Sequence, residues 1–147
     1  AKERNIFAQE VEKIVNKIKD SGAEAALYMI HAFVEPHEDT NPQMINNIKQ
    51  MYVDAGNKND ALVIPVGLAF EKAYKAQKNI QLHKHYDGSH PNILGTYLAS
   101  CVVFASITHL SPLNIQYSYY DKISKEDKEF LQNIAKETVE DFYNIDL

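Results

Sequence analysis

Several segments of the chain carry apolar residues at the spacing of a helix. The first begins near Asn5 and ends before Gly22, a residue type that commonly terminates helices. The second begins at Thr40-Asn41-Pro42, where a capping side chain precedes proline in the first turn. Further helices are expected over residues 68–77, over residues 93–110, and from the capping Ser124 onwards.

Two short apolar runs lack helical spacing and predict strands. They cover residues 25–30 and 61–66. Neither run alternates apolar with polar residues, and a continuous apolar run is typical of a parallel strand that is covered on both faces. Pro65 has no backbone donor, so we expect it near the end of the second strand. Strands that alternate with helices predict an α/β fold.

The chain has the length of one domain, residues 1–147, but too few strands for the expected sheet. A two-stranded sheet is only marginally stable by itself, and the first helix has no strand before it. We therefore expect further strands upstream of residue 1. Their absence would leave an unpaired edge on residues 25–30.

Composition narrows the possible partners. The net charge of -5 argues against a nucleic-acid partner, because neutralising phosphates requires clustered Lys and Arg. No apolar run approaches the roughly 20 residues of a transmembrane helix.

The single cysteine, Cys101, excludes an internal disulfide and is expected to be a small buried apolar residue.

The richest chemistry lies in the loop that follows the second strand. Asp87 precedes His90 by three residues, with a glycine between them that permits a tight turn. A hydrolytic general base needs an imidazole whose other nitrogen is held by a carboxylate. Pro91 would fix the backbone where the next helix begins, and ligands of open α/β sheets bind beyond the ends of the strands. Asp87 and His90 are therefore our candidate catalytic pair.

The stretch Asp87-Gly-Ser-His-Pro-Asn-Ile-Leu-Gly-Thr-Tyr-Leu-Ala99 resembles the last conserved block of the SGNH/GDSL hydrolase family. In that family an Asp and a His complete a triad with an upstream serine. Residues 25–31 resemble the penultimate strand of the family and residues 62–67 its last strand. His31 departs from the pattern, because such proteins often carry a tryptophan near this position.

The resemblance implies a flavodoxin-like three-layer α/β/α sandwich with an incomplete parallel sheet, of which this chain is the C-terminal portion. It implies hydrolysis of an acyl or acetyl ester of a carbohydrate or lipid, without metal or organic cofactor. His90 would be the general base and Asp87 would orient it. A secreted or periplasmic bacterial protein would fit the same family.

The nucleophile expected from the resemblance does not occur in this chain. No Gly-Asp-Ser motif is present, and Ser89 is best explained as a turn residue. We therefore expect this chain alone to be nearly inactive, with the serine supplied by a missing N-terminal segment. A non-catalytic binding or assembly module, such as a homo-oligomer, is the alternative.

Other interpretations of the polar loops stay open. His83, His85, Asp87 and His90 offer metal-ligand types within eight residues, which would suit a zinc-dependent hydrolase. The simpler expectation is that His83 and His85 are exposed loop residues. Three acidic residues follow the first strand: Glu35, Glu38 and Asp39. A pair of such carboxylates would suit a glycosidase, although acidic residues in a loop of this kind are usually just solvated.

Overall fold

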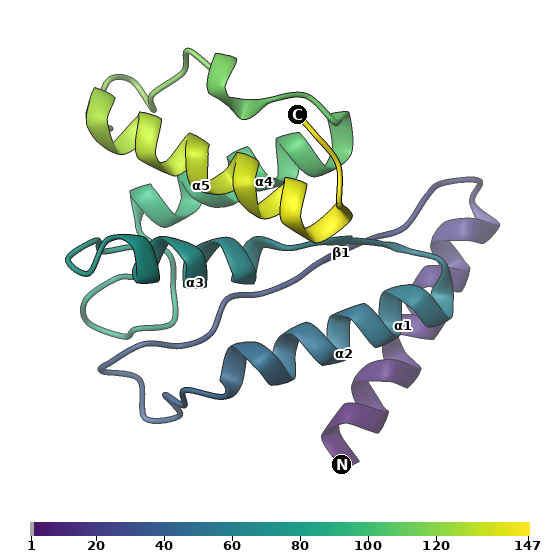
Figure 1. Cartoon of the computed structure of the whole chain (residues 1–147). Coiled ribbons are helices and arrows are strands. Elements are labelled where there is room, and N and C mark those ends of the chain that lie inside the picture. The colour runs from purple at the N-terminus through teal and green to yellow at the C-terminus, as the bar shows by residue number, and fades with distance from the viewer. Residues whose placement is uncertain (1) are drawn as a thin grey trace.

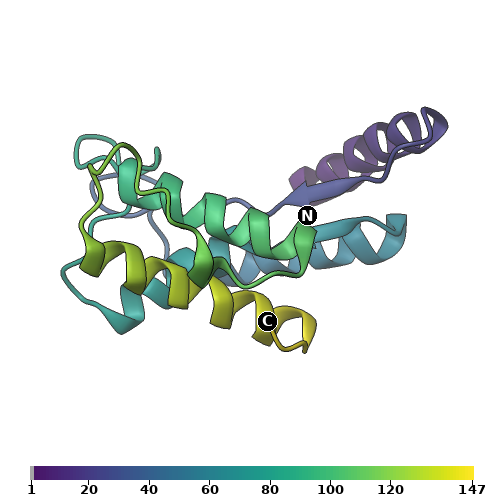
Figure 2. The same ribbon diagram turned by 90° about the horizontal axis from the view of Figure 1, so that it is seen from above.

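Helices lie on both sides of a short parallel sheet in the computed structural model, which describes residues 2–147 (Figures 1 and 2). Helices α1 and α2 lie on one side of the strands, and α4 and α5 lie on the other (Figure 1). The elements, in chain order, are α1 (Lys2–Asp20), β1 (Ala26–Tyr28), α2 (Met44–Asn59), β2 (Leu62–Ile64), α3 (Val66–Ala76), α4 (Ile93–Thr108), the 3-10 helix η1 (Pro112–Asn114) and α5 (Lys125–Tyr143). The predicted α/β class is confirmed, with helix predominating.

The two predicted strands pair with each other in parallel. Ala26 lies opposite Leu62, and Tyr28 lies opposite Ile64. Pro65 comes directly after β2 and precedes the first residue of α3, as expected from its missing donor. The expectation that both faces of β1 are covered was wrong: the Tyr28 side chain is 42% exposed. Among residues 2–147, β1 pairs with β2 alone, so its other edge has no neighbouring strand.

The core lies between α3, α4 and α5. Helix α4 is apolar on nearly all sides, and Leu98 and Val102 are fully buried on it. The side chain of Asn92 begins this helix by accepting the backbone N–H groups of Leu94 and Gly95. A Cβ at Gly95 would lie 2.2 Å from the carbonyl oxygen of Leu82, so only glycine allows this close approach of helix and loop.

Two predicted helix starts are shifted by local hydrogen bonds. Helix α2 begins at Met44 and not at Thr40. The Thr40 hydroxyl donates to the carbonyl of His37, and the Asn41 side chain accepts the N–H of Gln43, so these residues form the turn that precedes the helix. Helix α3 begins directly after Pro65, two residues earlier than expected.

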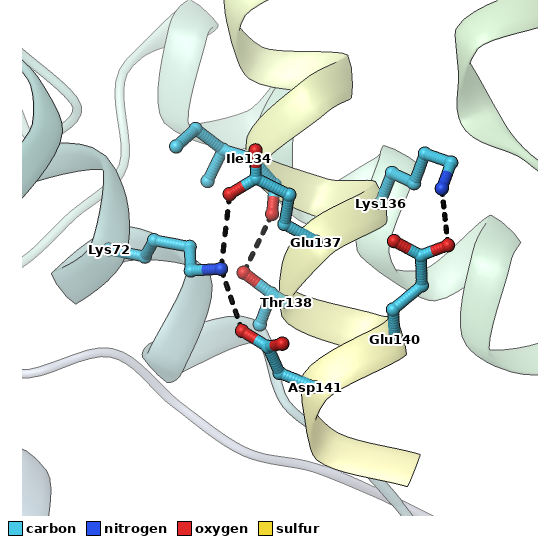
Figure 3. Close-up of polar contacts among 7 residues, drawn as sticks. All are labelled: Lys72, Ile134, Lys136, Glu137, Thr138, Glu140 and Asp141. Carbon is cyan, nitrogen blue, oxygen red and sulfur yellow. Dashed lines mark hydrogen bonds and ion pairs between the residues drawn. The ribbon is translucent and has the colours of Figure 1, made fainter. Parts of the chain in front are cut away.

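A lysine on α3 joins two acids on α5, as Figure 3 shows. Lys72 Nζ lies 3.1 Å from a carboxylate oxygen of Glu137 and 2.8 Å from one of Asp141. Burial would lower the pKa of Lys72, but the hydrogen bonds to the two carboxylates outweigh it and raise the pKa. Both acids are largely exposed, so each pair contributes about 1 kcal/mol or less to stability. Packing therefore holds α3 against α5 more than charge does.

We expect Leu98→Ala to lower the free energy of unfolding by about 2–5 kcal/mol, because it leaves a cavity beside fully buried neighbours. Ser100→Ala on the same helix is the matched control, since Ser100 is exposed and its hydroxyl bonds only back to the carbonyl of Thr96 among the described residues. The control should change stability by about 0.5 kcal/mol or less. Urea denaturation measures the free energy of unfolding of both variants. Equal losses of this free energy would contradict the placement of the core.

Candidate functional site

The loop between α3 and α4 is held at both ends by backbone hydrogen bonds. His83 and Pro91 form an isolated antiparallel bridge. The N–H of Lys84 donates to the carbonyl of His90 at 2.8 Å, and the N–H of Asn92 donates to the carbonyl of Leu82 at 2.8 Å. The residues between these bonds, which include both candidate catalytic residues, therefore form a closed and defined turn.

Asp87 is the acceptor at the centre of this turn. Its Oδ1 accepts the N–H of Ser89 at 2.8 Å and the N–H of His90 at 2.9 Å. Its Oδ2 lies 2.9 Å from Nδ1 of His90. The backbone N–H groups of His90 and Ser89 hold the pKa of the Asp87 carboxyl far below its usual range, and the imidazole adds to this effect. The carboxylate is thus ionised throughout the physiological range.

His90 is oriented by Asp87 through one ring nitrogen. Because a carboxylate only accepts, Nδ1 of His90 carries the hydrogen, which leaves the lone pair of the neutral ring on Nε2. The side chain is 72% exposed, and Nε2 has no hydrogen-bond partner within residues 2–147. The structure therefore brings together the predicted pair, with Nε2 available as a proton acceptor.

Ser89 is placed unsuitably for a nucleophile. Its Oγ lies 3.2 Å from Nδ1 of His90 and 3.4 Å from Oδ1 of Asp87. Nδ1 is already engaged with the carboxylate, whereas a serine activated by His90 would need to reach Nε2. Ser89 is a turn residue, in agreement with the sequence.

Gly88 fixes the turn to the segment that follows β1. The N–H of Val34 donates to the carbonyl of Gly88 at 2.9 Å. Gly88 has a φ of +64°, and a Cβ there would lie 1.9 Å from the carbonyl oxygen of Val34. The left-handed conformation and the close approach both require glycine. The candidate pair therefore lies against the segment that follows β1, where the chain returns after β2 and α3.

The expectation that His83 is exposed was wrong. Its side chain is only 4% exposed, because it packs between Tyr74, Phe70 and His31. Its two ring nitrogens contact Tyr74 and His31. The sequence contains a weak sign of this burial, since His83 follows the buried residues Ile80 and Leu82. His85 is exposed, as expected.

The arrangement does not suit the metal interpretation. Both ring nitrogens of His83 already contact other side chains of the protein. His85, two residues further along the chain, is exposed. Across residues 2–147, no three His, Cys, Asp or Glu side chains are gathered as a metal ion requires. The carboxylates proposed for a glycosidase are exposed and lie in the loop before α2: Glu35, Glu38 and Asp39.

An apolar cavity of about 610 Å³ opens beside Pro91, between α4 and residues 115–123. A buried polar group supports its wall: the amide of Gln132 donates to the hydroxyl of Tyr97 and to the carbonyl of Ile115. Cys101 lines the cavity, and burial raises the pKa of its thiol to about 11. This thiol is therefore protonated at neutral pH and behaves as the apolar residue expected from the sequence.

We expect Asp87→Asn to destabilise the protein at pH 7, since folding favours the ionised carboxylate. The unfolded chain protonates Asp87 near its ordinary pKa of about 3.9, whereas the folded pKa is lower. The stabilisation is therefore complete above about pH 5 and is lost as the pH falls through the range below about 4. Urea unfolding of both proteins from pH 3 to pH 7 measures this.

The difference between wild type and Asp87→Asn should narrow in acid. Asp39→Asn, which changes an exposed loop acid, is the control and should show a much smaller effect at every pH. A difference at pH 7 that persists unchanged at pH 3 would contradict the role of the Asp87 charge.

Comparison with known proteins identifies a structural neighbour. The chain superposes on the crystal structure of a DUF4886 family protein from Bacteroides uniformis with a TM-score of 0.83 and 18% sequence identity. The match covers 98% of this chain and 59% of the other, so this chain spans about three fifths of its neighbour's length. No family model matches the sequence. A search of curated proteins also finds no match.

The predicted membership of the SGNH/GDSL hydrolase family was wrong. The structural likeness is to a DUF4886 family protein, and it shows a shared fold. The motif misled because each of its residues has a local explanation: Asp87 caps the turn, Gly88 adopts a left-handed conformation, and Asn92 begins α4. A short pattern set by turn and capping chemistry does not identify a family. As expected, none of the helices described is both long and apolar enough to cross a membrane.

Proposed function

We propose that this chain supplies the general base and its orienting carboxylate for serine-dependent hydrolysis of an ester. The observation that carries the proposal is the 2.9 Å contact between Asp87 and Nδ1 of His90, which leaves Nε2 of an exposed imidazole free. Ser89, the one serine with a hydrogen-bond contact to His90 among the described residues, faces the wrong nitrogen, so we propose that the nucleophile comes from polypeptide outside residues 1–147.

The chemistry balances with these groups alone. Nε2 of His90 takes the proton of the serine hydroxyl as its oxygen attacks the ester carbonyl. The ionised Asp87 stabilises the resulting imidazolium, which then gives the proton to the leaving alcohol. Water, activated by His90 in the same way, releases the acid and restores the serine. The reaction uses no metal or organic cofactor.

The substrate we favour is an acyl or acetyl ester of a lipid or carbohydrate. The cavity beside Pro91 supports an apolar group on one side of the ester, since its volume of about 610 Å³ lies in the range of small-molecule sites. Pro91, which follows His90 directly, and Lys84 line this cavity, so it opens beside the turn that carries the base.

The free edge of β1 supports a larger, flavodoxin-like sandwich. Backbone groups of Ala25 and Met29 bond to the β2 side, so those of Ala26 and Tyr28 point to the opposite edge. The neighbouring face of α4 also exposes apolar side chains, with Ile107 59% exposed. Further parallel strands at this edge would cover that face, and they would place the missing serine in the same domain as His90.

The test compares this chain with the full-length product of its gene, using p-nitrophenyl acetate turnover and fluorophosphonate labelling. We expect the full-length product to be labelled on a serine outside residues 1–147. His90→Ala and Asp87→Asn should each lower its kcat by about a thousandfold or more. His85→Ala, which changes an exposed histidine of the same loop, is the control and should retain activity.

Residues 1–147 alone should turn over substrate far more slowly and remain unlabelled. Labelling of a serine within these residues would contradict the proposal. Full activity of the His90→Ala product would contradict it equally.

The unpaired edge of β1 also favours a second candidate function, assembly through strand pairing with another copy of the chain. Light scattering after gel filtration should then show dimers, and Tyr28→Lys should shift them to monomers, since a charge at an edge strand opposes pairing. Tyr120→Lys, at a tyrosine that is 80% exposed in the loop before α5, is the control. Monomers of wild type at high concentration would exclude this function.

A further inference from the structure

The cavity between α4 and residues 115–123 has an apolar floor and an open rim. Tyr97, Cys101 and Ile123 line it and are buried. Thr96 and Ser100, from the same helix as Tyr97, also line it and are exposed. The cavity therefore reaches from the solvent to the edge of the hydrophobic core, and a small molecule can enter it while the chain stays folded.

Buried hydrogen bonds fix the walls of this cavity. The side-chain amide of Gln132 on α5 donates to the hydroxyl of Tyr97 and to the carbonyl of Ile115. The same hydroxyl donates to the carbonyl of Tyr117 at 3.1 Å. Because Gln132 is only 2% exposed, breaking these bonds would leave a buried amide without partners. The bonds tie the loop to both helices, so the cavity is a built feature of the fold and not a gap left by loose packing.

The outer wall of the cavity is a turn with a disfavoured backbone conformation. Tyr119, Tyr120 and Asp121 have φ values of +54°, +55° and +59°, which residues other than glycine rarely adopt in succession. The Ser118 hydroxyl donates to the carboxylate of Asp121, and the N–H of Ile123 donates to the carbonyl of Ser118. This turn places Tyr119 and Ile123 against the cavity. Strained backbone of this kind clusters at ligand sites, which supports a binding role for the cavity.

The polar groups at the rim are neutral or positive. Thr96 and Ser100 contribute hydroxyl groups, and Lys84 contributes an ammonium group whose Nζ lies 5.7 Å from the centre of the Tyr86 ring. No aspartate or glutamate is among the described residues that line the cavity. An apolar floor below such a rim suits a molecule with an apolar body and an anionic end.

We propose that this cavity binds the acyl chain of a medium-chain fatty acid, with its carboxylate directed to Lys84, and that this acid is the product of the ester on which His90 acts. The volume of about 610 Å³ is far larger than an acetyl group requires, which favours a longer chain. The N–H of Lys84 donates to the carbonyl of His90 at 2.8 Å, so a carboxylate at Lys84 would lie on the side of the cavity that faces the base. The link to catalysis rests on the proposed function, whereas binding of the free acid needs no nucleophile.

The first test is isothermal titration calorimetry of the full-length gene product with octanoate, below the concentration at which micelles form. We expect one octanoate per chain and no measurable binding of acetate, since each buried methylene raises affinity about fourfold. Octanol has the same chain without the charge and should bind about fivefold more weakly. Absence of octanoate binding would overturn the inference, as would tighter binding of maltose than of octanoate.

The second test places the ligand by substitution. Ser100→Phe adds a ring at the rim and should weaken octanoate binding at least tenfold, whereas Asn133→Phe, at an exposed position of α5 outside the cavity, is the control. Lys84→Gln should weaken octanoate binding about fivefold and leave octanol binding unchanged. Lys78→Gln, at an exposed lysine before the same loop, is its control.

Two results of the substitutions would overturn the inference. Unchanged octanoate affinity in Ser100→Phe would place the ligand outside this cavity. Equal effects of Lys84→Gln on octanoate and octanol would contradict the placement of the carboxylate. Thermal unfolding of each variant establishes that it is folded before its affinities are compared.

Kinetics of the full-length gene product separate this inference from the proposed function. The KM for p-nitrophenyl octanoate should be at least tenfold lower than that for p-nitrophenyl butyrate, and Ser100→Phe should remove the difference. If His90→Ala retains activity, the proposed function is wrong, whereas the calorimetry still tests the cavity. If His90→Ala abolishes activity while the wild type binds no octanoate, the role of the cavity alone is wrong.

Discussion

The carboxylate of Asp87 organises the turn on which the candidate site depends. It accepts hydrogen bonds from two backbone N–H groups and contacts the imidazole of His90. A single side chain therefore closes the loop and sets the tautomer of His90. Gly88, which no other residue could replace without moving Val34, fixes the same turn to the end of β1. The loop is therefore rigid for structural reasons, and this rigidity also orients His90.

A second polar group, the chain of Tyr74, His83 and His31, lies directly behind this turn. It differs from the Asp87–His90 pair in kind, because His83 at its centre is buried, while the His90 side chain is exposed and faces an ionised acid. The unpaired edge of β1 and the exposed Ile107 of α4 lie near each other, and under the proposed function this is where further strands are added.

Local interactions explain which features the sequence could predict. The Asp87–His90 contact was foreseeable because the residues are three apart and glycine permits the turn, and α4 was foreseeable from its apolar run. The contact between His31 and His83 was not, because it joins segments 52 residues apart and arises only when β1 and β2 pair. The exposure of β1 was missed because an apolar run specifies what a strand would bury and not whether its partner is present. The family assignment failed since turn and capping residues recur wherever such a turn precedes a helix.

The central claim is that Asp87 fixes His90 with its lone pair on Nε2, and the ¹⁵N chemical shifts of the His90 ring test it most directly. At pH 8 the account predicts hydrogen on Nδ1 in the wild type, because Asp87 accepts it, and a mixture of both tautomers in Asp87→Asn. A wild-type ring that carries its hydrogen on Nε2, or one whose tautomer is indifferent to Asp87→Asn, would contradict the account.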